Sequence, residues 1–126
     1  MSRAILGPSF RREDARGTLV EILNTGSWAS LLSGSMKRDA VLGNHYHKST
    51  SVFFFLTRGR ARIRTVDVYT GMREDFVLSA DQGVQLVAGE SHAICFLEDS
   101  EFLMLKSRAY TEADLDTFFH DVSDPA

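Results

Sequence analysis

Cysteine, proline and long apolar runs are scarce in this 126-residue sequence, and each scarcity excludes a class of structure. Cys95 is the single cysteine, so the chain cannot form an internal disulfide, which favours the reducing cytoplasm. Proline occurs only near the two ends, at Pro8 and Pro125, and no repeat or linker is visible between them. No apolar run approaches the roughly 20 residues of a membrane-spanning helix, so we expect no membrane partner.

An excess of basic charge is also lacking. Lys and Arg total 14 and Asp and Glu total 17, which gives a net charge of −3, so a nucleic acid is not the expected partner. Hydrophobic residues make up 44% and charged residues 25%, as is typical of a globular protein. A chain of this length forms one core, so we expect a single domain over residues 1–126.

Short runs of β-forming residues alternate with turn-forming residues along most of the chain. Glycine, asparagine, aspartate and serine stand in the turns, as at Asn24–Gly26 and Asp81–Gly83. This regular spacing predicts an all-β sandwich or barrel. The expected strands are Thr18–Leu23, Ser27–Ser33, Val41–His47, Ser51–Leu56, Arg60–Tyr69, Arg73–Ser79, Val84–Val87, His92–Leu97 and Phe102–Lys106.

The spacing of apolar residues changes near the end of the chain. Thr111 followed three residues later by Asp114 resembles a capping box, in which the hydroxyl accepts from the first free N–H groups of a helix. Apolar residues then recur with the period of one helix face. The pattern predicts a short amphipathic helix over about 111–122 that covers an open end of the β unit, with Leu115, Phe118, Phe119 and Val122 on its apolar face.

Two of the four histidines stand two residues apart, at His45 and His47. On a strand such residues point to the same face, roughly 7 Å apart, so two imidazoles can converge on one metal ion or one substrate. His92 begins a later expected strand, just after a glycine-containing turn. Because an isolated His-x-His pair is common in proteins, its meaning depends on the residues around it.

The residues around the histidines fit two known sequence motifs. His45, His47 and Gly59 have the spacing of the first motif, and Gly89 and His92 have the spacing of the second motif. The sequence therefore resembles the cupin family, whose motifs are Gly-x5-His-x-His-x3–4-Glu-x6-Gly and Gly-x5-Pro-x-Gly-x2-His-x3-Asn. The resemblance extends from about residue 14 to residue 122. It implies a double-stranded β-helix, or jelly-roll barrel, with its core at about residues 14–109.

The sequence also departs from the cupin motifs at several positions. Cupins usually hold a metal with three histidines and one glutamate, and here Val52 stands in place of that glutamate. The remaining set, His45, His47 and His92, can hold Zn²⁺ or Fe²⁺ with water in the open positions. Without a metal, the same histidines are free as acid–base groups. Either site carries more positive charge than a cupin site with its carboxylate, so it favours an anionic ligand. The other replaced motif positions are Asp39, Asp81, Val87 and Phe96.

Two groups of cupins resemble the chain most closely. The segments Asp14–Leu23, Gly43–His47 and Thr117–Val122 are similar to the C-terminal cupin domain of capsular-polysaccharide epimerase/reductases. That resemblance implies zinc binding and C-3 epimerisation of a nucleotide-activated 4-keto sugar. Asp14–Val20 and the histidine pair are also similar to the dTDP-4-keto-6-deoxyglucose 3,4-ketoisomerases, which work without metal.

The expected function is therefore an isomerase or epimerase acting on a nucleotide-linked keto-sugar. His45 and His47 would be the acid–base pair or, with His92, the metal ligands. A 4-keto sugar has an acidic C-3 proton, and a histidine inside a barrel can remove it because its pKa lies near neutrality. Two alternatives stay open at this point. One is a three-histidine Fe²⁺ dioxygenase, and the other is a non-catalytic cupin that binds a small ligand.

Four arginines alternate with other residues between residues 58 and 64 and point to one side of a strand. They form either a solvated outer face or a contact for a nucleotide diphosphate, with Arg60 and Arg62 as the candidate ligands. Arg38 and Lys48 flank the strand that carries the histidine pair and are the other substrate-binding candidates.

The run Val52–Leu56 is apolar on both faces of its expected strand. If His45 and His47 face inward, Val52, Phe54 and Leu56 line the barrel interior, whereas Phe53 and Phe55 face outward. Two outward phenylalanines need a cover, from the second sheet layer, the C-terminal helix or another subunit. We favour a homodimer through that sheet.

Overall fold

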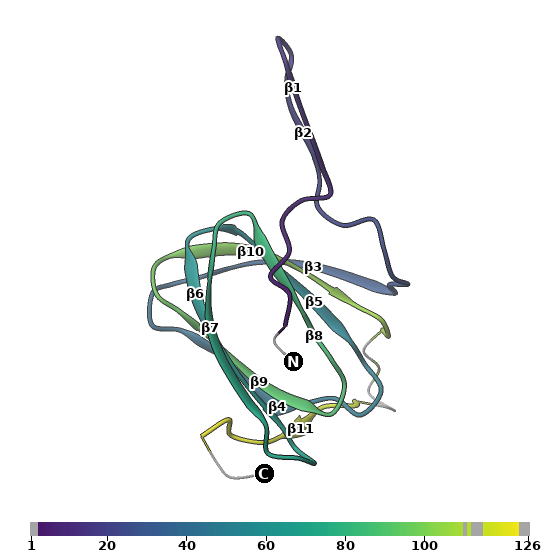
Figure 1. The fold of residues 1–126 in the computed structure, drawn as a ribbon, viewed down its shortest axis with the longest axis vertical. Coiled ribbons are helices and arrows are strands. Elements are labelled where there is room, and N and C mark those ends of the chain that lie inside the picture. Colours follow the sequence, from purple (N-terminus) through teal and green to yellow (C-terminus); the bar gives the residue numbers. More distant parts are fainter. Residues whose placement is uncertain (1–2, 110, 112–114, 124–126) are drawn as a thin grey trace.

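The computed structural model describes residues 3–109, 111 and 115–123, and the described residues form strands and loops (Figure 1). In that part of the chain there is no helix of the length and hydropathy that crossing a membrane requires. The strands are β1 (Phe10–Asp14), β2 (Gly17–Glu21), β3 (Ser30–Met36), β4 (Val41–Tyr46), β5 (Val52–Arg58), β6 (Arg60–Asp67), β7 (Arg73–Ser79), β8 (Gln82–Leu86), β9 (Glu90–Phe96), β10 (Ser100–Lys106) and β11 (Phe118–Phe119).

Two antiparallel sheets make up the body of the fold. One has four strands in the order β3-β10-β5-β8, and the other has five in the order β11-β4-β9-β6-β7. Figure 1 shows the two sheets facing each other around a common interior. Strands that are neighbours in a sheet come from distant parts of the sequence, as in a jelly roll. The predicted all-β, cupin-type jelly roll is confirmed, and each of the nine expected strands overlaps an observed one.

The core lies between the sheets and follows the alternation of each strand. Val52, Phe54 and Leu56 of β5 are buried in it, as the sequence predicted, together with Ala61 and Ile63 of β6. The intervening residues of β6 are exposed, because successive side chains of a strand point to opposite faces. This alternation decides which side chains of the neighbouring strands reach the interior of the barrel.

Phe53 and Phe55 lie on the opposite face of β5 and are nevertheless 3% and 1% exposed. The ring of Phe53 lies 6.5 Å from that of Trp28 and stacks on that of Phe55 at 6.2 Å. Both rings also pass close over Gly83 of β8, where a Cβ atom would meet them at 2.7 and 2.9 Å. The sequence analysis favoured a second subunit as the cover of these rings, but the chain buries them itself.

The predicted C-terminal helix is wrong. Phe118 and Phe119 form β11, which pairs with Tyr46 and His45 at the edge of β4. Asn44 anchors this segment, because its main-chain carbonyl accepts from the His120 N–H at 2.9 Å and its side-chain oxygen accepts from the Val122 N–H at 3.1 Å. The edge of β4 supplies main-chain hydrogen-bond partners for this segment. Pairing with β4 therefore outweighs the helical spacing of the apolar residues. The capping box falls partly outside the described residues, since they do not include Asp114.

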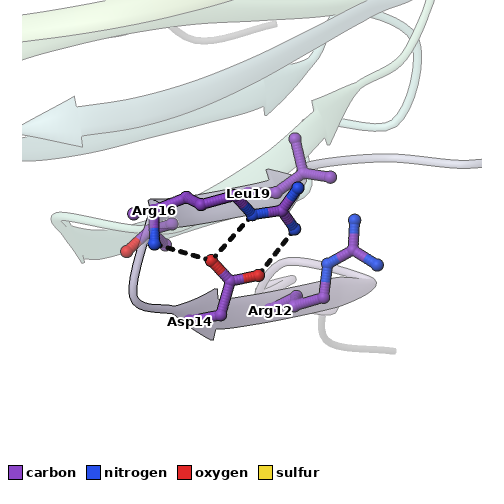
Figure 2. A pocket seen from close by; sticks show the side chains of 6 residues that line it. Arg12, Asp14, Arg16 and Leu19 are labelled. Carbon is purple, nitrogen blue, oxygen red and sulfur yellow. Dashed lines mark hydrogen bonds and ion pairs between the residues drawn. The ribbon is translucent and has the colours of Figure 1, made fainter.

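The sequence analysis missed β1, which pairs with β2 in a hairpin that projects from the barrel (Figure 1). The turn of this hairpin is the Asp14–Gly17 segment that carries the family resemblance. The Asp14 carboxylate accepts from the Arg16 main-chain N–H at 2.9 Å and from its guanidinium at 2.7 Å (Figure 2). Gly17 has a φ of 143°, which an L side chain rarely adopts. These residues therefore specify a turn, and the pocket around them lies on the projecting hairpin, outside the barrel.

Candidate functional site

Three histidines meet inside the barrel. His45 lies on β4, His47 follows the end of that strand, and His92 lies on the neighbouring β9. The ring centroids are 5.1 Å apart for His45 and His47, 4.8 Å for His45 and His92, and 5.8 Å for His47 and His92. One ring nitrogen from each lies within 4.8 Å of the others, so the expected convergence is confirmed.

A bulge in β4 aligns these rings. The register of β4 against β9 shifts between Gly43 and His45, and this shift sets His45 opposite His92. Gly43 has a φ of 105°, and a Cβ atom there would lie 2.3 Å from the carbonyl oxygen of His92. Asn44 follows with a φ of 58°. A glycine at position 43 is therefore required, because only a residue without a side chain allows the two strands to approach this closely.

The ring of His47 is oriented by the C-terminal segment. Its Nδ1 lies 2.7 Å from the main-chain carbonyl oxygen of Asp116, which can only accept, so Nδ1 carries a proton and the lone pair of the neutral ring is on Nε2. The Asp116 carboxylate in turn accepts from the N–H of Lys48 at 2.9 Å, the N–H of Ser49 at 3.0 Å and the hydroxyl of Thr50 at 2.7 Å. Burial alone would raise the pKa of Asp116, but these hydrogen bonds outweigh it and lower the pKa.

The histidines open into a cavity of about 140 Å³. Pockets that enclose a whole drug-sized ligand measure roughly 300–1,000 Å³, so this cavity suits one part of a ligand, such as a single ring. Apart from the histidines its lining is mostly apolar, and it includes Val52 at the position of the cupin glutamate. The other lining residues are Leu42, Gly43, Ile94, Met104 and Lys106.

Burial makes two of the histidines weak bases. Burial lowers the pKa of His45 to about 4, and the nearby His47 and Lys106 lower it in the same direction. Burial lowers the pKa of His92 to about 3, with further lowering from His45 and His47. Both rings are therefore neutral at neutral pH, and each keeps a lone pair that can bind a metal or accept a proton.

Lys106 brings a cation to the cavity that the sequence analysis did not single out. It is the last residue of β10 and pairs with Val52 of β5. The signal was present in the strand alternation, because Phe102 and Met104, on the same face of β10, both pack in the core. A lysine two residues after Met104 breaks an apolar pattern at an inward-facing position, which is a recognisable sign of a polar site.

The residues present fit a divalent metal. Neutral imidazoles are good ligands for zinc and iron, and three of them are close enough here to share one ion. Ligating histidines usually donate their second ring nitrogen to a fixed acceptor, and His47 donates to Asp116 in this way. Among the described residues, the buried Nδ1 of His92 has no hydrogen-bond partner.

The structure does not bring the predicted arginines to the histidines. Arg60 and Arg62 are exposed on the outer face of β6, because Ala61 and Ile63 between them point into the core. Arg62 is also paired with Asp75 of β7, with Nε 2.8 Å from a carboxylate oxygen. These two side chains therefore lie on the opposite side of the sheet from the cavity.

Arg38 and Lys48 lie at opposite ends of the strand that carries the histidines. Arg38 is exposed in the turn before β4, where its main-chain N–H donates to Asp99 at 2.9 Å. Lys48 directly follows His47, and its ammonium lies 4.4 Å from the centroid of the Phe118 ring. The Phe118 ring also contacts that of Tyr46, and none of the four predicted substrate-binding residues is among those that line the cavity.

The profile of the polysaccharide biosynthesis C-terminal domain family matches residues 12–118 of the chain. The chain belongs to this family. A curated relative, the UDP-2-acetamido-2,6-beta-L-arabino-hexul-4-ose reductase of Pseudomonas aeruginosa, is 25% identical over 117 residues. The match covers 90% of this chain and 32% of that protein, so the family member described here spans about a third of the relative's length.

Solved structures support the fold of this polysaccharide biosynthesis C-terminal domain. The capsular polysaccharide assembling protein CapF from Staphylococcus aureus matches with a TM-score of 0.70 and 23% identity, over 89% of this chain and 34% of CapF. A dTDP-4-dehydrorhamnose 3,5-epimerase from Sulfolobus tokodaii matches with a TM-score of 0.74 and 19% identity, over 88% of this chain and 73% of that one. Both comparisons agree with the cupin-type barrel.

Proposed function

We propose that this domain is an isomerase or epimerase that acts on a nucleotide-activated keto-sugar by moving the proton next to the ketone. The observation that carries the proposal is the meeting of His45, His47 and His92 in one largely apolar cavity. Family membership supports a role in polysaccharide biosynthesis. The named relatives include a UDP-sugar reductase and a dTDP-sugar epimerase, which supports the same class of substrate.

The reaction would begin with a neutral histidine over one face of the sugar ring, and His45 and His47 are the proposed acid–base pair. The imidazole takes the proton from the carbon beside the ketone as the C–H bond breaks. The electron pair of that bond moves into the carbonyl group and leaves a negative charge on its oxygen. Return of a proton to the opposite face of the same carbon gives the epimer, and return to a different carbon gives an isomer.

A divalent metal is the alternative to this acid–base scheme. His45, His47 and His92 are the residues that would hold it. When bound, such an ion would polarise the ketone and stabilise the negative charge on its oxygen. A ring that gives its lone pair to the ion cannot also take the sugar proton, so the acid–base role of His45 and His47 belongs to the metal-free protein.

Deuterium exchange tests the proposal directly. The protein is incubated in D₂O with a UDP- or dTDP-linked 4-keto sugar, with and without a chelator, and deuterium at the carbon beside the ketone is followed by NMR. Wash-in of deuterium supports the isomerase or epimerase. Oxygen uptake by an iron-loaded protein would instead support the three-histidine dioxygenase, and neither activity would leave a non-catalytic ligand-binding cupin.

The nucleotide end of the substrate needs cations outside the small cavity. Lys48 is the proposed contact, because it is exposed and directly follows His47, which lines the cavity. Arg38, Arg60 and Arg62 stay predictions as diphosphate ligands, and their exposure leaves them accessible to a ligand that extends over the surface.

We also propose that the protein forms a homodimer and is located in the cytoplasm. The β1–β2 hairpin pairs with itself away from the barrel (Figure 1). It leaves Phe10 49% and Leu19 57% exposed. An isolated two-stranded hairpin is marginally stable in water, so a second copy that covers these residues would stabilise it. The single cysteine supports the reducing compartment.

A further inference from the structure

We infer that Lys106 is the cationic group of the cavity and binds the negatively charged ketone oxygen that forms when a histidine removes the neighbouring proton. This inference rests on the proposed function. It assigns to a side chain of β10 the charge stabilisation that a cupin metal site would otherwise supply. It also predicts that the charge of Lys106 weakens the binding of a divalent cation by the three histidines.

The position of Lys106 is the first argument. Lys106 lines the same cavity as the three histidines, and it pairs with Val52 across β10 and β5. Val52 occupies the place of the metal-binding glutamate in the cupin motif. The barrel therefore lacks the carboxylate that a cupin metal site has at position 52. Lys106 lies opposite that position, on the paired strand β10.

The charge of the lining is the second argument. Among the described residues that line this cavity, Lys106 has a formal positive charge and none is a carboxylate. The usual cupin set has one negative charge from its glutamate, whereas this set has one positive charge from Lys106.

The consequence for chemistry follows from Coulomb's law in a cavity of low dielectric. A fixed ammonium stabilises an oxygen anion strongly there, because little water competes for it. The same ammonium repels a divalent cation from the three imidazoles. The proton removed from the sugar stays on the histidine, the electron pair goes to the ketone oxygen, and Lys106 neutralises that oxygen without itself gaining or losing a proton.

The experiment compares three variants by two readouts. Lys106→Met keeps the length of the side chain and removes the charge, Lys106→Arg keeps the charge, and Lys37→Met is the matched control on an exposed residue outside the cavity. The first readout is deuterium exchange into a UDP- or dTDP-linked 4-keto sugar in the presence of chelator. The second, which needs no substrate, is the affinity of the chelator-treated protein for Zn²⁺ by calorimetry.

We expect Lys106→Met to lower kcat for exchange by about 10²-fold, with a smaller change in KM, because the charge develops only during the reaction. We expect the same variant to bind Zn²⁺ about tenfold more tightly or better, because a repelling charge is gone. Lys106→Arg should retain most of the exchange activity, and Lys37→Met should match the wild type in both readouts. Thermal unfolding of each variant identifies any loss that comes from misfolding.

Two results overturn the inference. One is exchange by Lys106→Met at the wild-type kcat, which leaves the proposed function standing without Lys106. The other is unchanged Zn²⁺ affinity in a folded Lys106→Met variant. If the wild type exchanges no deuterium at all, the proposed function fails, and with it the ketone-oxygen role of Lys106. The Zn²⁺ measurement then still decides whether Lys106 makes the cavity cationic.

Discussion

The Nδ1 atom of His47 lies 2.7 Å from the main-chain carbonyl oxygen of Asp116, although the two residues are 69 positions apart in the sequence. The same aspartate uses its carboxylate to hold the loop that follows His47. One residue of the C-terminal segment therefore fixes both the tautomer of a cavity histidine and the loop beside it. This relationship connects the end of the chain to the candidate site.

Replacement of Asp116 should loosen this loop. An Asp116→Asn side chain has one acceptor oxygen for three donors, so we expect a loss of about 1–3 kcal/mol in the free energy of unfolding at pH 7. The pKa of Asp116 is lowered in the folded state, so its stabilisation is present above the unfolded pKa of about 3.9 and is lost as the pH falls through the folded value. Urea unfolding at pH 7 and pH 3 measures both effects.

The loss caused by Asp116→Asn should thus be smaller at pH 3 than at pH 7. Glu101→Gln, on an exposed residue of β10, is the matched control and should change little at either pH. Equal losses at both pH values in Asp116→Asn would contradict the assigned carboxylate interactions.

Removal of a cavity histidine should abolish the proposed activity. We expect His47→Ala to lower deuterium exchange by at least about 10²-fold, because acid–base groups contribute roughly 10²–10⁴ in rate. It should also weaken Zn²⁺ binding, which calorimetry measures. His120→Ala is the control, since His120 lies beside Tyr46 outside the cavity. Retention of both exchange and metal binding in His47→Ala would refute the role of the histidine cluster.

Acid should destabilise the protein through its buried histidines. The folded pKa values of His45 and His92 are about 4 and about 3, against an ordinary value of 6.5. Between pH 6.5 and these folded values the unfolded chain binds more protons than the folded one. Stability is therefore full above pH 6.5 and decreases as the pH falls towards 4 and 3.

Urea unfolding in the presence of a chelator at pH 7, 6 and 5 tests this direction. A His92→Gln variant should lose less stability between pH 7 and 5 than the wild type does, because one of the protonating groups is gone. His120→Gln, outside the cavity, should follow the wild type. The prediction fails if His92→Gln and the wild type lose stability in parallel over this interval.

A carboxylate at position 52 should change the metal preference of the cavity. Val52→Glu places a negative charge opposite Lys106 and beside the histidines, at the position of the cupin glutamate. We expect Zn²⁺ affinity to rise by about tenfold or more through charge attraction. Val52→Gln has nearly the same size without the charge and is the matched control. Equal Zn²⁺ affinities for the two variants, both folded by circular dichroism, would count against the charge argument.

The exposed apolar residues of the hairpin should support the proposed homodimer. We expect light scattering to give a dimer mass for the wild type and a monomer mass for the Phe10→Ser, Leu19→Ser double variant. Val77→Ser, which removes a 41% exposed apolar side chain from β7, is the control and should remain a dimer. A monomeric wild type would remove the dimer proposal.

Several features of this fold were readable from the sequence because they depend on short-range periodicity. Residues Val52–Leu56 and the turns between the β-forming runs indicated the strands and the interior face of β5, and the structure agrees. The His45–His47 pair predicted a shared face because strand geometry fixes it. Gly43 and Asn44 add a bulge beside that pair, and the interior position of the pair is retained.

Other features depend on partners that are distant in the sequence. Residues 115–122 have the spacing of a helix, but the open edge of β4 offers them main-chain partners, so part of the segment became β11. Phe53 and Phe55 needed a cover, and only the packed chain showed that Trp28 and β8 supply it. The sequence placed Arg60 and Arg62 on one side of a strand, and only the burial of Ile63 showed that this side faces away from the cavity.

The sequence by itself thus determined nine of the eleven strands that the structure describes, the barrel class and the face shared by His45 and His47, because alternation and turn chemistry act over a few residues. The structure confirmed that His92 completes the cluster, and only the tertiary structure decided that Asp116 orients His47 and that Lys106 lies across from Val52. Those relationships arise where strands from distant parts of the chain pair in a particular register. Register is set by the packing of the whole barrel, which no local pattern encodes.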